Sequence, residues 1–136
     1  MKPQEFVEYI LGKQNVIPWE IRIVMSTIPS NDDIIRNNAA RIIHAILRDV
    51  YKIPDIRDEN LLQEALKLKD LYDCRSCVTS IKQVYSRGIM KARYEISGNT
   101  ETCRIFGGRE KFELSDVDWE MPIVGVNIRQ SPEKYL

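Results

Sequence analysis

The chain has 136 residues, of which 43% are hydrophobic and 29% are charged, a composition typical of one folded domain with its own core. Its 20 basic and 20 acidic residues balance, whereas dedicated nucleic-acid binders usually carry a basic excess. No run approaches the ~20 apolar residues of a membrane-spanning helix, and the first residues lack the apolar core of a signal peptide. We therefore expect a single cytoplasmic domain over residues 1–136, with a helical part (1–91) and a smaller β-containing part (92–130).

Apolar residues recur at helical spacing in five segments. The predicted helices cover residues 3–12, a segment from Pro18 to just before Pro29, and residues 31–51, 59–71 and 74–87. Ser30 and Asp33 resemble a capping box before the third helix, which has the broadest apolar stripe and should be the central packing element. Asp58 and Asp73 are expected to cap the fourth and fifth helices, and Gly88 is the expected C′ residue of the fifth.

The pattern changes after the fifth helix. Residues 94–96 and 103–105 alternate around the turn residues Ser97-Gly98-Asn99, which predicts a β-hairpin that Gly107-Gly108 should end. The predicted fold class is therefore mainly α, with about five helices and a small β-hairpin or sheet near the C-terminus.

Two further segments follow the hairpin. Residues 109–116 could hold another short helical turn. Residues 121–130 are apolar with strand-like composition, and we expect them to pair with the hairpin or to lie against the helices.

Three short stretches resemble S-layer homology repeats. The run from Ser80-Ile81 to Gly88-Ile89-Met90 is similar to the first helix of such repeats, and residues 109–114 (REKFEL) resemble the start of their second helix. Residues 35–40 are similar to the family's Thr-Arg-Ala-Glu stretch, with Asn38 replacing the glutamate, and the family's Asp-Gly turn is missing. The resemblance implies a helical, non-catalytic module that recognises cell-wall glycan, with Arg36 as the one binding residue that transfers.

Cys74 and Cys77 form a CxxC motif near the start of the fifth predicted helix. A helix N-terminus lowers the pKa of a thiol, as in redox sites, but CxxC redox sites follow a strand, and here an apolar helix precedes the motif. The spacing places both sulfurs near the buried stripe, so we favour structural cysteines that pack in the core. Three cysteines in all fit a reducing compartment better than a disulfide scaffold.

A structural zinc site needs about four ligands, which Cys74, Cys77, Cys103 and His44 would supply. A single CxxC without a second ligand pair gives that interpretation little support, and we expect His44 to be a partly buried hydrogen-bonding residue. The chain has one histidine and neither a G-x-S-x-G nor a phosphate-loop motif. We therefore expect no enzyme activity and no cofactor.

The remaining candidate residues are of types that favour binding to a partner. The basic-aromatic segment consists of Lys82, Tyr85, Arg87, Lys91, Arg93 and Tyr94. It could contact phosphates and bases, or it could be a solvated helix end, and its stretch from Arg87 to Arg93 is the part expected to be exposed and to meet a partner. Trp19 and Trp119 are candidate partner contacts where exposed and packing residues where buried.

The predicted function is a non-enzymatic module that binds another protein. Small, neutral accessory proteins, including phage-encoded inhibitors and regulators, have this profile. The alternatives are a glycan-binding module similar to S-layer homology repeats and a nucleic-acid-binding regulator.

Overall fold

The structure is a computed structural model that describes residues 1–12, 17–98 and 102–119. Its helices are α1 (Pro3–Leu11), α2 (Trp19–Met25), α3 (Arg36–Ala45), α4 (Glu59–Leu66) and α5 (Val78–Ser86). A two-stranded antiparallel hairpin follows them. The predicted class, mainly α with a small β element near the C-terminus, is confirmed, while the predicted strand or arm at 121–130 lies outside the described residues.

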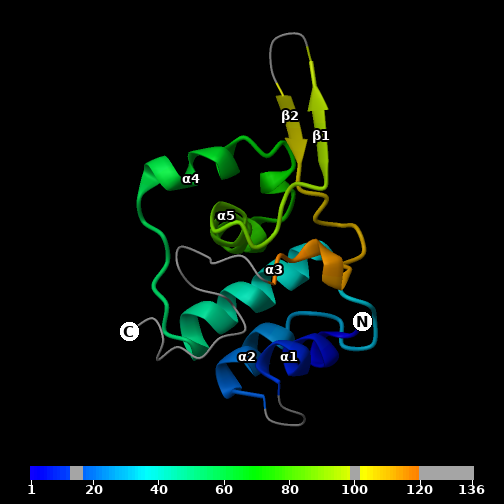
Figure 1. Ribbon diagram of the computed structural model, residues 1–136. Helices are drawn as coiled ribbons and strands as arrows, with labels where there is room; N and C mark the ends of the chain where they lie inside the picture. Colours follow the sequence, from blue (N-terminus) through cyan, green and yellow to red (C-terminus); the bar gives the residue numbers. More distant parts are fainter. Residues whose placement is uncertain (13–16, 99–101, 120–136) are drawn as a thin grey trace.

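The helix α3 lies in the middle of the molecule, with α1 and α2 on one side and α5 and α4 on the other (Figure 1). Ile42 and Ile43 of this helix are fully buried, and burying one such side chain is worth about 1.5–3 kcal/mol. The core cluster runs from Phe6 in α1 to Val117, beyond the hairpin. The central position predicted for the third helix is therefore what the structure has.

The start of α3 differs from the prediction. The helix begins at residue 36 because Ile35 is extended and pairs in an antiparallel bridge with Lys111. The backbone N–H of Asn37 then donates to the carbonyl oxygen of Gly108 at 2.8 Å. A distant segment thus satisfies the first N–H groups of the helix, so the predicted capping box is wrong, and Asp33 instead pairs with the N-terminal amine at 2.9 Å.

The two helix starts further along the chain differ in their caps. Asp58 caps α4 as predicted, accepting from the backbone N–H of Asn60 at 2.9 Å. The cap predicted for α5 is wrong, because the N-cap of that helix is Cys77. The 3₁₀ turn η3 (Arg75–Cys77) occupies the first residues of the predicted fifth helix, and a second 3₁₀ turn, η2 (Leu71–Asp73), lies just before it.

The helix ends follow local sequence signals more closely. Gly12 ends α1 with φ 69°, and Gly88 follows α5 with φ 78°, the left-handed conformation that glycine adopts at low cost. Pro18 is the N-cap of α2, which ends at Met25. At its C-terminal end α3 continues into η1 (Ile46–Val50), one π-helical turn.

The hairpin consists of β1 (Tyr94–Ser97) and β2 (Thr102–Ile105), which confirms its predicted position. It projects away from the helices (Figure 1). The short helical turn expected after it is η4 (Leu114–Asp116). In the part of the chain that the structure describes, no helix combines the length and the apolar character that crossing a bilayer requires.

Candidate functional site

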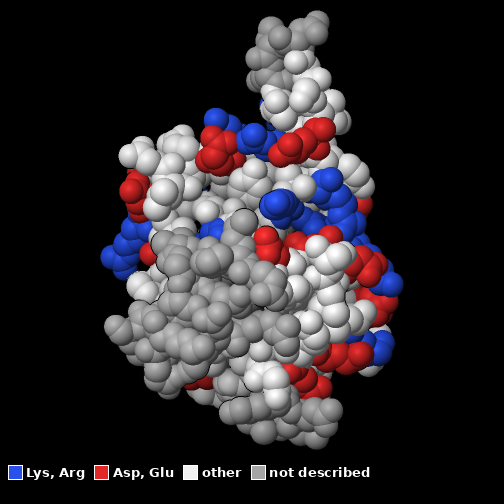
Figure 2. Space-filling model, in the orientation of Figure 1, with Lys and Arg blue, Asp and Glu red and all other residues white. Residues whose placement is uncertain are grey.

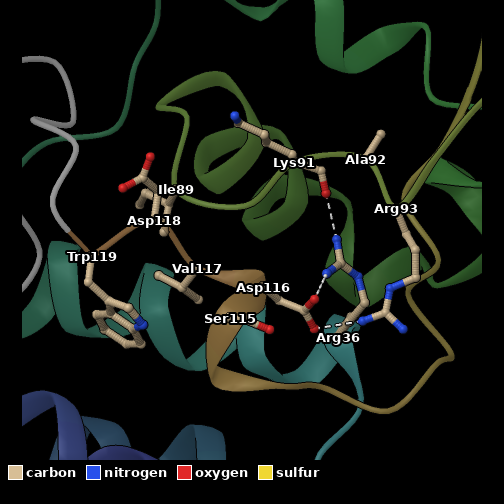
Figure 3. A pocket seen from close by; sticks show the side chains of 10 residues that line it. All are labelled: Arg36, Ile89, Lys91, Ala92, Arg93, Ser115, Asp116, Val117, Asp118 and Trp119. Carbon is tan, nitrogen blue, oxygen red and sulfur yellow. Dashed lines mark hydrogen bonds and ion pairs between the residues drawn. The ribbon is translucent and has the colours of Figure 1, made fainter.

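A cavity of about 600 Å³ brings together four of the residues that the sequence singled out. Arg36, Lys91, Arg93 and Trp119 all line it (Figure 3). They come from the first turn of α3, from the segment that leads into β1 and from the segment after η4. These segments meet because the chain returns past α3 after the hairpin.

Arg36 forms the floor of this cavity and is only 2% exposed. Its Nη1 lies 3.0 Å from Oδ1 of Asp116, and its Nη2 donates to the carbonyl oxygen of Lys91 at 2.6 Å. Its Nε donates to the carbonyl oxygen of Phe106, and the guanidinium lies 4.7 Å from the centre of that ring. Burial lowers the pKa of Arg36, and Asp116 offsets part of this effect, so the buried cation is paired and hydrogen-bonded within the chain.

Asp116 also binds a second arginine. Its Oδ2 accepts from Arg93 Nη2 at 2.7 Å and from the backbone N–H of Glu113 at 2.9 Å. Burial alone would raise the pKa of Asp116, but this backbone hydrogen bond and the two guanidinium groups outweigh it and hold the pKa below its ordinary value. The carboxylate therefore stays charged, and the array is a mutually satisfied ion network with no acid–base pair poised at different pKa values.

Two residues of the cavity wall differ in what they offer to a partner. Lys91 is exposed, and its ammonium points away from Arg36. Trp119 is partly buried: its indole N–H donates to the carbonyl oxygen of Leu114 at 2.9 Å, and its ring lies 5.2 Å from that of Tyr9. Lys91 is thus the accessible group, and Trp119 acts mainly as a packing residue.

The rest of the basic-aromatic segment does not form one surface. Arg87, expected at the exposed end, is 7% exposed and donates to the carbonyl oxygen of Pro54 at 2.8 Å, so that expectation is wrong, and burial lowers its pKa. Lys82 and Tyr85 line two other cavities. Trp19 is 67% exposed on α2, on the opposite side of α3 from α5 (Figure 1).

An exposed apolar surface that sequence reasoning did not single out lies on the hairpin. The hairpin face consists of Tyr94, Ile96, Cys103 and Ile105, since Tyr94 pairs with Ile105 and Ile96 with Cys103 across the strands. Tyr94 is 46% exposed and Ile96 is 60% exposed. Alternation of the side chains was visible in the sequence, but their exposure depends on the absence of a helix over this face among the described residues.

The other side of the hairpin is polar, and its Arg104 contacts α4. Arg104 of β2 pairs with Glu64 of α4 at 2.6 Å and with Glu95 of β1 at 3.3 Å. These ion pairs orient the hairpin so that its apolar side points away from α4. Around it the molecular surface carries interspersed cations and anions (Figure 2).

His44 has the hydrogen-bonding role expected of it. It is 4% exposed, with Nδ1 3.0 Å from Ser80 Oγ and Nε2 2.7 Å from Asp55 Oδ1. Because a carboxylate only accepts, Nε2 carries the proton in the neutral ring and Nδ1 accepts from the Ser80 hydroxyl. This is the order of groups used in nucleophilic hydrolysis, but Ser80 is only 8% exposed, so we interpret the series as a link between α3, α5 and the segment before α4.

This link gives a testable prediction. Ser80→Ala leaves the buried Nδ1 of His44 without its partner, so it should lower the free energy of unfolding by about 1–3 kcal/mol. Thr79→Ala, on the adjacent exposed position of α5, should change it by less than about 0.5 kcal/mol. Urea unfolding measures both. Equal values, or labelling of wild-type Ser80 by an organophosphonate, would contradict this interpretation.

The cysteines are arranged only in part as expected. Cys74 and Cys77 both pack as expected, with Cys77 in the core cluster and Cys74 against it, but they also form a disulfide that was not predicted from the sequence. Cys103 is a partly exposed free thiol on β2. Among the described residues no group of three or more His, Cys, Asp or Glu side chains is placed to hold a metal ion, and the structure does not assemble the zinc quartet with His44.

Comparison with known proteins found no match. A scan against protein-family models, a search of the curated proteins and a search of the solved structures each gave no match. The similarity to S-layer homology repeats therefore stays a prediction, and the site has to be interpreted from its own geometry.

Proposed function

We propose that this chain is a non-catalytic module that binds another protein through the hairpin face. The observation that carries the proposal is the exposure of Tyr94 and Ile96 on a hairpin that projects from the helices. A two-stranded hairpin is marginally stable alone in water, and exposed apolar patches with polar rims mark interaction sites. An accessory or inhibitory role, in which the hairpin occupies a surface of its target, fits this arrangement.

The partner we propose contributes an extended segment. One edge of the hairpin is occupied, because the backbone N–H of Lys69 donates to the carbonyl oxygen of Arg104 in β2 at 3.0 Å. Among the described residues β1 pairs only with β2, so its outer edge offers unpaired backbone groups to an added strand. Alternate apolar side chains of that strand would cover Tyr94 and Ile96.

Charge indicates a further feature of the partner segment. Lys91 is exposed three residues before Tyr94, and it has no ion pair within the described part of the chain. A carboxylate in the partner would meet this ammonium near the start of β1. We therefore propose an apolar extended segment that carries an acidic side chain at one end.

The same geometry gives less support to the two alternatives. Arg36 pairs with Asp116, and Arg93 pairs with both Asp116 and Glu110, whereas nucleic-acid binding relies on cations that are free to replace counterions. Arg36, the residue implied for glycan recognition, already donates hydrogen bonds to the carbonyl oxygens of Phe106 and Lys91 within the chain. A protein partner remains the function that the exposed groups favour.

Ile96→Asp tests the proposal, with Ile23→Asp as the matched control. Ile23 on α2 is 50% exposed and Ile96 is 60% exposed, so both substitutions replace an exposed isoleucine with a negatively charged side chain. For a partner identified by affinity capture with the wild-type chain, Ile96→Asp should weaken the measured affinity at least about tenfold, as expected of a hot-spot residue. Ile23→Asp should leave that affinity unchanged, and both variants should keep the wild-type melting temperature.

Two outcomes would contradict the proposal. One is an affinity that falls equally for both variants or only for Ile23→Asp, which would place the contact on α2 near Trp19. The other is binding of labelled oligonucleotides whose affinity drops steeply with salt, because that dependence indicates phosphate contacts. Lys91→Glu separately tests the acidic feature of the partner and should weaken binding alongside Ile96→Asp.

A further inference from the structure

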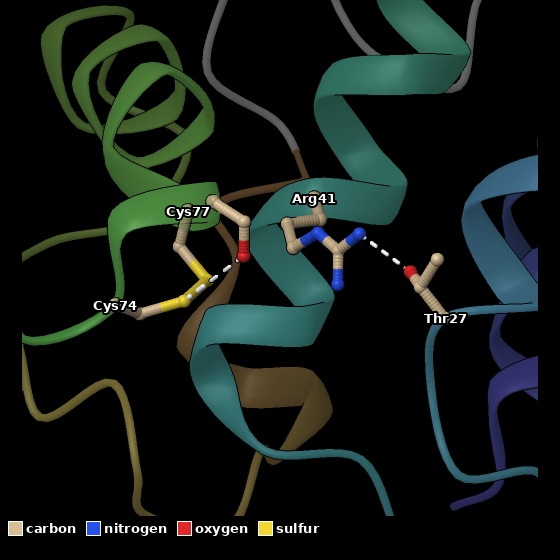
Figure 4. Close-up of a disulfide and its surroundings, with 5 residues drawn as sticks. Thr27, Arg41, Cys74 and Cys77 are labelled. Carbon is tan, nitrogen blue, oxygen red and sulfur yellow. Dashed lines mark hydrogen bonds between the residues drawn. A yellow bond between two sulfur atoms is a disulfide. The ribbon is translucent and has the colours of Figure 1, made fainter.

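The disulfide between Cys74 and Cys77 has no part in the binding surface. It lies at the start of α5 and beside α3 (Figure 4), whereas the hairpin face is on another element. It closes a loop of only four residues, and short closed loops restrict the unfolded chain least. Its contribution to stability through chain entropy is therefore small, which leaves its chemistry as the feature to explain.

The two sulfurs differ in access. Cys74 is partly exposed, with its Sγ 3.5 Å from the hydroxyl of Ser76, whereas Cys77 is 1% exposed. An external thiolate attacks a disulfide along the line of the two sulfurs and must reach one of them. Only Cys74 offers that approach.

The two sulfurs also differ as leaving groups. Cys77 is the N-cap of α5, a helix of nine residues, where the aligned N–H groups favour negative charge and lower the pKa of a thiol. Cys74 has Asp73 on one side and Arg75 on the other in the chain, two charges of opposite sign. Attack on Cys74 necessarily releases Cys77, and the helix N-terminus favours the negative charge of that leaving thiolate.

We propose that Cys74–Cys77 is a thiol–disulfide exchange site that a dithiol enters through Cys74. A thiolate of the dithiol attacks Cys74 Sγ, forming a mixed disulfide and releasing Cys77 as a thiolate. The second thiolate of the dithiol then attacks the sulfur that the dithiol contributed to the mixed disulfide. This closes a disulfide within the dithiol and releases Cys74 as a thiolate. Two electrons pass to the protein, the dithiol becomes a disulfide, and two protons restore the thiols of Cys74 and Cys77.

The test compares the two sulfurs separately, with Cys103→Ser present in every variant to remove the third thiol. The Cys77→Ser variant keeps Cys74, which should react with dithionitrobenzoate, an aromatic disulfide with a coloured product, to give one mixed disulfide per chain. The Cys74→Ser variant keeps the buried Cys77 and should react at least about tenfold more slowly. Equal rates, or faster reaction of Cys77, would overturn the proposal.

A second measurement needs no change to the cysteine pair. The chain with both cysteines is treated with dithiothreitol in native buffer, quenched with acid and mapped by mass spectrometry. We expect both thiols to become free without denaturant, and the mixed disulfide to be found on Cys74. A disulfide that opens only after unfolding, or a mixed disulfide on Cys77, would overturn the proposal even where a variant fails to fold. Neither result depends on the partner proposed for the hairpin face.

Discussion

Replacing Arg36 with methionine is expected to lower the free energy of unfolding by about 3–5 kcal/mol, because it removes one partner of a buried ion pair. Asp116 would keep Arg93 but lose the guanidinium 3.0 Å away. The carbonyl oxygens of Lys91 and Phe106 would lose their donors at the same time. Loss of this size is a large part of the 5–15 kcal/mol that stabilises a typical domain, and urea unfolding followed by circular dichroism measures it.

Arg48 provides the matched control. It pairs with Asp49 at 3.0 Å, but its side chain is 47% exposed, and exposed ion pairs contribute about 0–1 kcal/mol. Arg48→Met should therefore cost far less than Arg36→Met. Similar losses for the two variants would mean that the buried network is not what holds the segment after the hairpin against α3.

The pH dependence of stability in acid is a second test of the same ion pair. The pKa of Asp116 lies below its ordinary value of 3.8, so its charged form stabilises the fold above that pH, and this contribution is lost as the pH falls below 3.8 through the lower folded value. Arg36→Met removes one of the groups that hold the pKa down. The slope of stability against pH in this window should therefore be shallower in the variant than in the wild type.

The sequence predicted those features that depend on neighbouring residues. The apolar stripe of α3, the cap by Asp58 and the left-handed Gly88 are local signals, and all three are present. The start of α3 could not be predicted, because it depends on the bridge between Ile35 and Lys111. Here a pairing between segments far apart in the chain determined the helix start, and the local capping signal did not.

The candidate site shows the same division. Arg36 was noticed only through a family resemblance, and nothing in the sequence connects it to Asp116, its partner across the whole α5 and hairpin region. His44 was expected to form hydrogen bonds, but its partner Ser80 is 36 positions away. Arg87 is buried with its guanidinium donating to the carbonyl oxygen of Pro54. A backbone acceptor of this kind cannot be predicted from the pattern of side chains.

Gly108→Ala is the second substitution with a large expected effect, with a loss of about 3 kcal/mol in the free energy of unfolding. A Cβ at this position would overlap the side-chain amide of Asn37. Asn37 is 6% exposed in the first turn of α3, so its side chain has little room to move. The backbone of Gly108 is held in place as well, because its carbonyl oxygen accepts from the N–H of Asn37 at 2.8 Å.

Gly12→Ala separates this overlap from the general cost of replacing glycine. A Cβ at Gly12 would meet nothing within 4 Å, but the residue has a positive φ of 69°, which costs an alanine about 1–2 kcal/mol. The loss at Gly12 is therefore one of backbone conformation alone. A loss at Gly108 no larger than that at Gly12 would contradict the close approach of the two segments.

A double-mutant cycle identifies the atoms responsible. Asn37→Ala removes the amide that a Cβ at Gly108 would meet, so Asn37→Ala combined with Gly108→Ala should be more stable than the sum of the single losses predicts. The coupling should recover about 1–2 kcal/mol of the loss caused by Gly108→Ala. Strict additivity would mean that the alanine acts through the backbone and not through Asn37. Recovery of stability in the double variant would show that position 108 requires glycine because the segment after the hairpin packs directly on the start of α3, beside Arg36.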